Sequence, residues 1–136
     1  MPVCFLDTNI LLRYLVGDDQ ERAERSLNLL LRVESGEEKV FTSSLVIFET
    51  IFTLQKFYKV PRQEIQERIL DIISLRNLQL PDKDVYYRAF KIYTSQNISF
   101  ADAYNAAYAL LEERPHIYSW NTDFDKIDGI IRIEPE

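Results

Sequence analysis

Four acidic side chains, each in a different segment of the chain, are the residues best suited to chemistry. They are Asp7, Glu49, Asp102 and Asp123. Asp7 directly follows the apolar run 3–6, which predicts a strand buried on both faces at the centre of a sheet. A carboxylate at the end of such a strand lies at the sheet edge where ligands bind. Aspartate also caps helices, and the sequence leaves both roles open for Asp7.

Glu49 lies in an unusually apolar context. Its neighbours on a helix include Leu45, Val46 and Phe52, so the pattern predicts that this carboxylate is buried. Burial of an unpaired charge is costly, and a buried glutamate therefore needs a metal ion, a cation or a proton to neutralise it. The alternatives are that the helix turns Glu49 toward solvent or that an arginine pairs with it.

Asp102 and Asp123 occur in segments that also have ordinary structural uses. Ser99, with Asp102 three residues later, imitates a capping box, while the alanines after Asp102 would let its helix approach a sheet closely. Asp123 and Asp125 follow the β-rich run 116–120, where a turn role competes with a site role. Each of these signals is weak when taken alone.

Together, the carboxylates come from four segments that a parallel α/β fold gathers at one sheet edge. Clustered carboxylates repel one another, and a hard divalent cation with oxygen ligands, Mg²⁺ or Mn²⁺, is their natural neutraliser. The chain has one Cys and one His, which cannot by themselves make a zinc site. We expect both, Cys4 and His116, to be buried strand residues without a catalytic role.

The elements that must position these side chains alternate between strands and helices. A chain of 136 residues, 46% of them hydrophobic, is typical of one domain, here 1–136. The alternation predicts an α/β fold, a three-layer α/β/α sandwich around a central, mostly parallel sheet. Strands are expected near 3–6, 39–42, 77–80, 116–120 and 130–133, and helices near 10–16, 20–34, 45–58, 61–75, 82–95 and 99–113.

Charge and hydropathy restrict the partners and the compartment. The chain has 16 basic and 22 acidic residues, a net charge of −6, so a polyanion would need a local basic patch or a bound cation. A single cysteine fits a reducing, cytoplasmic compartment. We expect no signal peptide and no membrane span, because the apolar stretches are too short.

Four short motifs, in this order, resemble those of PIN-domain ribonucleases, and chain size and motif order resemble the VapC-type toxins of toxin–antitoxin pairs. The motifs are Phe5-Leu6-Asp7-Thr8-Asn9, the segment 43–49 that ends in Glu49, Ser99-Phe100-Ala101-Asp102-Ala103, and Ser119-Trp120-Asn121-Thr122-Asp123-Phe124. The resemblance spans essentially the whole chain. It implies that Asp7, Glu49 and Asp102 are metal ligands and that Asp123 takes a more variable fourth acidic position.

The resemblance also implies supporting polar residues and leaves one position open. Thr8, Asn9 and Ser119 match polar residues that accompany the ligands. Many relatives have an aspartate where this chain has Asn121, so the fourth ligand position is open among Asn121, Asp123 and Asp125. We prefer Asp123, with Asn121 as a supporting oxygen.

The activity implied is hydrolysis of RNA phosphodiester bonds with Mg²⁺ or Mn²⁺. The resemblance further implies a cognate antitoxin protein and a homodimer. The aromatic side of helix 82–95 could contribute to a dimer contact, although core packing is its commoner use. Arg13, Lys56, Lys59 and Arg62 are candidates for a basic rim that would contact the RNA backbone.

Three other readings compete with this one. A catalytically inactive PIN-like module would bind RNA or protein without cutting it. A phosphatase of the haloacid-dehalogenase type usually needs a second aspartate where this chain has Asn9, and a receiver domain needs an acidic pair before the aspartate of the first strand. The intact acidic positions speak against the inactive module.

Overall fold

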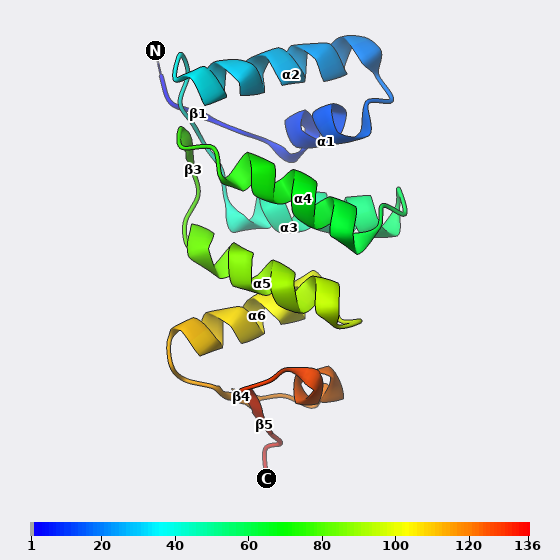
Figure 1. Ribbon diagram of the computed structural model, residues 1–136, viewed down its shortest axis with the longest axis vertical. Coiled ribbons are helices and arrows are strands. Elements are labelled where there is room, and N and C mark those ends of the chain that lie inside the picture. Colours follow the sequence, from blue (N-terminus) through cyan, green and yellow to red (C-terminus); the bar gives the residue numbers. More distant parts are fainter. Residues whose placement is uncertain (1) are drawn as a thin grey trace. The chain divides into compact units, whose positions relative to one another are not determined.

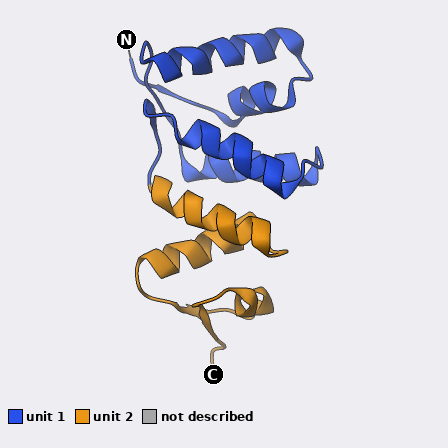
Figure 2. Ribbon diagram, in the orientation of Figure 1, with its two compact units in different colours: residues 1–81 blue, residues 82–136 orange. Residues whose placement is uncertain are grey.

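The computed structural model describes residues 2–136 and divides the chain into two compact units, Met1–Pro81 and Asp82–Glu136 (Figure 2). Strands and helices alternate along both units (Figure 1). Unit 1 contains β1 (Cys4–Phe5), α1 (Thr8–Val16), α2 (Gln20–Ser35), β2 (Val40–Phe41), α3 (Ser44–Lys56), α4 (Arg62–Ile73) and β3 (Leu78–Gln79). Unit 2 contains α5 (Lys83–Ser95), α6 (Phe100–Leu111), β4 (His116–Tyr118), the 3-10 helix η1 (Thr122–Lys126) and β5 (Ile131–Ile133).

The strands of unit 1 form a parallel sheet in the order β1-β2-β3. Cys4 lies opposite Val40, and Val40 lies opposite Leu78. The pairing continues past the strand ends, because the Leu6 amide donates to the Phe41 carbonyl at 2.8 Å. The carboxyl ends of these strands are therefore in register, and the segments that follow β1 and β2 begin side by side.

Two glycines determine where the first two helices end. Gly17 follows α1 and Gly36 follows α2, each with a positive φ, 71° and 89°, which only glycine adopts without strain. Asp19 starts α2 by accepting a hydrogen bond from the Arg22 amide. The result is a pair of helices joined by a short turn, and α1 packs against both α2 and α3.

Unit 2 is built around an aromatic core between α5 and α6. Tyr86, Phe90 and Tyr93 are fully buried, and each has a ring contact with Phe100 at the start of α6, with centroid separations of 4.6 to 6.2 Å. Core packing is therefore the use that the structure makes of the aromatic helix. Beyond the helices, β4 and β5 pair in parallel, with His116 opposite Ile131.

The sequence predictions of element type and of parallel pairing are confirmed, whereas some predictions of burial are wrong. In its sheet β1 is an edge strand, and Val3 and Phe5 are exposed, Phe5 to 48%. Cys4 and His116, predicted to be buried, are exposed as well. Side chains project from the two faces of a sheet, so their burial depends on what packs against those faces and not on strand pairing. Among residues 2–136, no helix is long and apolar enough to cross a membrane.

Candidate functional site

Asp7 lies between the end of β1 and the first turn of α1. It is the N-cap residue of α1, but its side chain makes no capping hydrogen bond. The carboxylate is exposed, while the neighbouring Thr8 is buried and anchors the helix start. Asp7 therefore occupies the N-cap position without its side chain acting as a cap. Its carboxylate oxygens remain available close to the positive end of the helix dipole.

The start of α3 is tied to the same sheet edge. The Thr42 hydroxyl donates to the carbonyl oxygen of Leu6 at 2.8 Å, a buried bond that joins the residue after β2 to the residue before Asp7. The next residue, Ser43, caps α3 by accepting from the Val46 amide at 3.3 Å. The segment that leads into α3 is therefore hydrogen-bonded to the residue before Asp7.

The prediction that the Glu49 carboxylate is buried is wrong, because Glu49 is exposed. The buried face of α3 consists of residues such as Val46, Ile47 and Thr50, and the helix turns Glu49 to the exposed side. There it lies between Leu45, 75% exposed, and Phe52, 64% exposed. It has no hydrogen bond or ion pair within the described part of unit 1, so it is uncommitted but solvated.

In unit 2, Asp102 is held by a side-chain amide. Its backbone N–H donates to the Ser99 hydroxyl at 3.1 Å, which confirms Ser99 as the cap of α6. Its carboxylate oxygen Oδ2 accepts from Asn121 Nδ2 at 3.0 Å. Asn121 in turn accepts from the Asp123 amide at 3.0 Å and donates its own N–H to Ser119 Oγ at 3.0 Å. The structure thus brings Asp102, Ser119, Asn121 and the backbone of Asp123 into one hydrogen-bonded chain.

The two aspartates of η1 have different partners. Asp123 forms an ion pair with Lys126 at 3.0 Å, and both side chains are partly exposed. Asp125 accepts from Arg132 Nε at 3.0 Å. The hydrogen bonds to Asp125 and then Glu134 hold the pKa of the Arg132 guanidinium above its usual range. Asp125 is therefore committed to holding β5, which leaves Asp123 as the better candidate of the two.

The donor set suits a hard cation. Within the described part of unit 1, the carboxylates of Asp7 and Glu49 have no hydrogen bond or ion pair, and in unit 2 Asn121 orients Oδ2 of Asp102. All of these donors are oxygens, the ligands that Mg²⁺ and Mn²⁺ prefer. Within the described residues, neither unit by itself groups three or more His, Cys, Asp or Glu side chains in a way that could hold a metal ion.

Sequence reasoning missed a group of basic residues beside α1. A groove of about 570 Å³ is lined by Arg13 of α1 and by three arginines of α2, Arg22, Arg25 and Arg32. Of the predicted basic rim, only Arg13 lines this groove. The signal was present, because residues 22, 25 and 32 fall on one face of a helix, but it was hidden by the acidic residues interspersed along the same helix.

The chain belongs to the PIN domain family. The sequence profile of that family, described as PIN domain, matches residues 4–130 and so runs through both compact units. A VapC ribonuclease of Aquifex aeolicus (strain VF5) is 26% identical to the chain over 130 residues, which are 96% of this chain and 95% of that protein. The predicted fold class and the resemblance to VapC-like PIN proteins are thereby confirmed.

Proposed function

We propose that the chain is a metal-dependent endoribonuclease and the toxin of a toxin–antitoxin pair, acting as a single PIN domain over 1–136. The observation that carries the proposal is Asp7, an exposed carboxylate at the end of the first parallel strand that occupies an N-cap position without capping. Family membership and the likeness to a VapC ribonuclease support the same conclusion.

Four carboxylates are proposed as the ligands of Mg²⁺ or Mn²⁺. Asp7 and Glu49 come from unit 1, and Asp102 and Asp123 from unit 2. Among the described residues of unit 1, neither Asp7 nor Glu49 has a side-chain hydrogen bond or ion pair, which fits this role because such a carboxylate has its oxygens available for a cation. Asp123 would exchange its ion pair with Lys126 for the metal.

The supporting polar residues have distinct tasks in this proposal. Asn121 fixes the Asp102 carboxylate with its Nδ2, and Ser119 fixes Asn121 through the backbone. Thr8 is buried at the start of α1, and the exposed Asn9 would offer its side-chain amide to the substrate phosphate. The ion, when bound, lowers the pKa of an attacking water and neutralises charge on the phosphate. The carboxylates that hold the ion would also orient that water.

The proposed substrate is RNA, and the proposed partners are a cognate antitoxin protein and a second copy of the chain. These rest on the likeness to a VapC ribonuclease. Mg²⁺ and Mn²⁺ are both compatible with an all-oxygen ligand set. The second candidate function, a PIN-like module that binds RNA or protein without cutting it, is favoured by the absence of a three-carboxylate group within either unit among residues 2–136.

Cleavage of a pool of structured RNAs tests the proposal. The wild type, Asp7→Asn and the control Asp71→Asn, an exposed aspartate of α4, are each incubated with Mn²⁺, Mg²⁺ or EDTA. We expect metal-dependent cutting by the wild type and the control, and a loss of more than about 100-fold in Asp7→Asn. Cleavage by Asp7→Asn at the wild-type rate would contradict the assignment, and equal RNA binding with and without metal, without cleavage, would favour the inactive module.

A further inference from the structure

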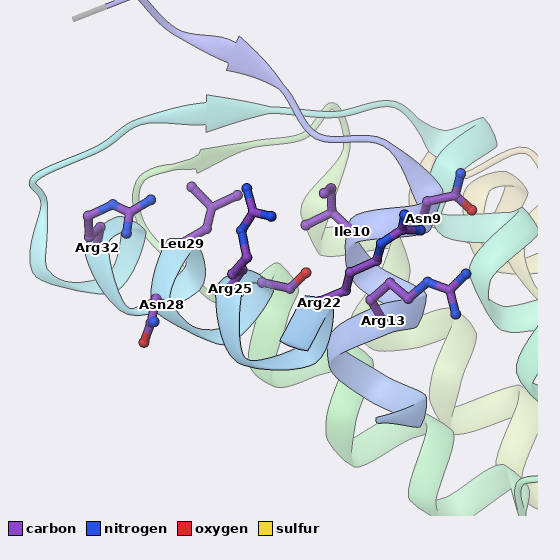
Figure 3. A pocket seen from close by; sticks show the side chains of 9 residues that line it. Asn9, Ile10, Arg13, Arg22, Arg25, Asn28, Leu29 and Arg32 are labelled. Carbon is purple, nitrogen blue, oxygen red and sulfur yellow. The ribbon is translucent and has the colours of Figure 1, made fainter. Parts of the chain in front are cut away.

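The groove beside α1 and α2 combines a basic lining with an apolar floor. Arg22, Arg25 and Arg32 follow one another along α2, with Arg13 and Asn9 contributed by α1 (Figure 3). Ile10 and Leu29 supply apolar surface between them. On α2 the arginines span ten residues, about 15 Å at the helical rise. The groove is therefore an elongated basic surface rather than a pocket for one small anion.

The local charge is opposite to that of the whole chain. The protein has a net charge of −6, yet the groove gathers four of its 16 basic residues, and no acidic residue of 2–136 lines it. Each arginine does have an acidic neighbour outside the groove: Arg13 contacts Asp18, Arg22 contacts Asp19, Arg25 contacts Glu21 and Arg32 contacts Glu38.

These ion pairs leave most of the guanidinium donors unused. Each pair involves one nitrogen of the arginine, at separations from 2.7 to 4.0 Å, and a guanidinium has five N–H donors. Exposed pairs of this kind are weak and are easily exchanged for another anion. The carboxylates therefore orient the arginines without blocking their approach to a ligand.

We infer that this groove holds the single-stranded RNA that flanks the scissile phosphate. The inference rests on the proposed function. Arginine forks bind phosphate oxygens in two-point contacts, while Ile10 and Leu29 offer apolar surface to bases or riboses. An elongated row of cations matches the repeated charges of a nucleic-acid backbone.

The position of the groove indicates the path that an RNA strand would take. Asn9 lines the groove, and it is two residues from Asp7 at the start of α1. A strand that lies on Arg32, Arg25 and Arg22 in turn thus reaches the candidate metal ligand at its α1 end. An acidic protein segment would also be attracted by the arginines, but the cation proposed at the adjoining Asp7 would favour a ligand that presents a phosphate at that end.

Binding of a fluorescent single-stranded RNA of about 12 nucleotides tests the inference. The triple variant Arg22→Gln, Arg25→Gln, Arg32→Gln is compared with a control, Arg76→Gln, Arg88→Gln, Arg114→Gln. The control arginines are exposed and line no part of the groove, so both variants change the net charge equally. Anisotropy is measured in EDTA over a salt series, which makes binding independent of cleavage.

We expect the groove variant to bind RNA at least about tenfold more weakly than the control and to lower the slope of log K against log salt by about 2, since three phosphate contacts are lost. Equal binding by the two variants would overturn the inference. So would a groove variant that keeps RNA binding but loses binding of a polyglutamate peptide, which would assign the groove to an acidic protein.

Cleavage kinetics separate this inference from the proposed function. With Mn²⁺, the groove variant should raise KM for a long RNA while kcat stays within about twofold, because the groove binds flanking strand and not the reacting atoms. If the wild type binds RNA without cutting it, and the groove variant does not bind RNA, the proposed function fails while the binding assignment stands. A fall in kcat alone, with KM unchanged, would contradict the groove's role.

Discussion

The candidate ligands of unit 1 and unit 2 differ in whether other side chains hold their carboxylates. In unit 1, Asp7 does not cap α1, and among the residues that the structure describes there, neither Asp7 nor the exposed Glu49 has an ion pair. In unit 2, Asn121 holds Asp102 at 3.0 Å, and Lys126 pairs with Asp123 at 3.0 Å. One unit therefore offers free carboxylates, whereas the other offers carboxylates that are already oriented.

This difference separates the candidate ligands whose orientation would depend on the metal from those that are oriented without it. An oriented carboxylate loses little conformational freedom when it binds an ion, and a free one loses more but needs no bond to be broken. Unit 2 is thus expected to define the geometry of the site, and unit 1 to supply charge. Variants that change the ligands of one unit at a time test this difference.

The largest effect is expected when one ligand is removed from either unit. Asp7→Asn and Asp102→Asn should each abolish the same Mn²⁺ binding event in calorimetry and lower cleavage by more than about 100-fold, because each removes a charge and an oxygen ligand of one shared ion. Asp7→Asn should leave the melting temperature unchanged. Asp102→Asn should lower it slightly, since the bond from Asn121 then loses its charged acceptor.

The control for this pair is Asp71→Asn, a neutralised aspartate outside both ligand sets. It should bind Mn²⁺ as the wild type does. If Asp7→Asn and Asp102→Asn each left a separate binding event intact, the two units would hold different ions, and the assignment of one site to four carboxylates would be wrong.

A second effect, smaller than the first, is expected at the amide that orients Asp102. Asn121→Asp replaces the Nδ2 donor with an oxygen that faces Asp102 Oδ2 at 3.0 Å. Without metal at pH 7, the free energy of unfolding should fall by about 1–2 kcal/mol, because a hydrogen bond is exchanged for repulsion between like charges. Mn²⁺ should restore the stability, since a cation neutralises both carboxylates.

The pH dependence of this variant has a definite sign. Repulsion between two carboxylates requires that both are charged, so its cost should be larger at neutral pH than in acid. Urea unfolding of wild type and variant at several pH values measures it. Asn28→Asp, on an exposed position of α2 in unit 1, adds the same charge on a different helix from Asp102 and should show no such dependence. An equal loss in both variants would mean that Asn121 does not orient Asp102.

These contrasts also indicate what the sequence alone can predict. The apolar runs and helix caps located the elements, and Ser99 and Asp7 lie at helix starts as their residue types predict. Burial was harder to predict, because it depends on which face of a helix packs against the rest of the unit. The side chain of Glu49 has apolar neighbours along the chain, but residues 46, 47, 50, 51 and 54 form the buried face and leave it in solvent.

The partners of the unit 2 carboxylates could not be predicted either. The bond from Asn121 to Asp102 joins residues 19 positions apart, and the pairing of Arg132 with Asp125 depends on the parallel return of β5. Contacts of this kind follow from tertiary packing rather than from local pattern. The arginines of α2 were missed for the opposite reason, because their helical spacing was visible but acidic neighbours concealed a common face.

The caps of α3 and α6 give the next effect in size. Ser43→Ala and Ser99→Ala each remove one hydrogen bond to a backbone amide, of 3.3 and 3.1 Å, and should each lower stability by about 1 kcal/mol. Their effects on Mn²⁺ affinity should differ. Ser99 caps the turn that carries Asp102, so its loss should weaken binding a few-fold, whereas Glu49 lies six residues beyond Ser43.

Chemical denaturation measures the loss of stability, and calorimetry measures the metal affinity of the two cap variants. Ser99→Thr, which keeps the hydroxyl, should restore both quantities. If Ser43→Ala weakened Mn²⁺ binding as much as Ser99→Ala does, the position of Glu49 would depend on its cap as closely as that of Asp102. The division between an oriented and an unoriented ligand pair would then not hold.

The smallest effect is expected at Lys126, whose ion pair with Asp123 competes with the metal. The two side chains are 47% and 35% exposed, so the pair contributes only about 0.2–1 kcal/mol. Lys126→Met should therefore raise Mn²⁺ affinity by about 1.5- to 5-fold. Lys56→Met in unit 1 controls for the change in net charge, and calorimetry again measures the affinity.

A double variant makes this small effect decisive. In an Asp123→Asn background, Lys126→Met should leave Mn²⁺ affinity unchanged, because the lysine then has no ligand to release. If the gain persisted in that background, Lys126 would act through another carboxylate, and Asp125, freed from Arg132, would be the next candidate for the fourth ligand. A gain that depends on Asp123 would instead place that residue in the metal site and show that its lysine partner limits affinity.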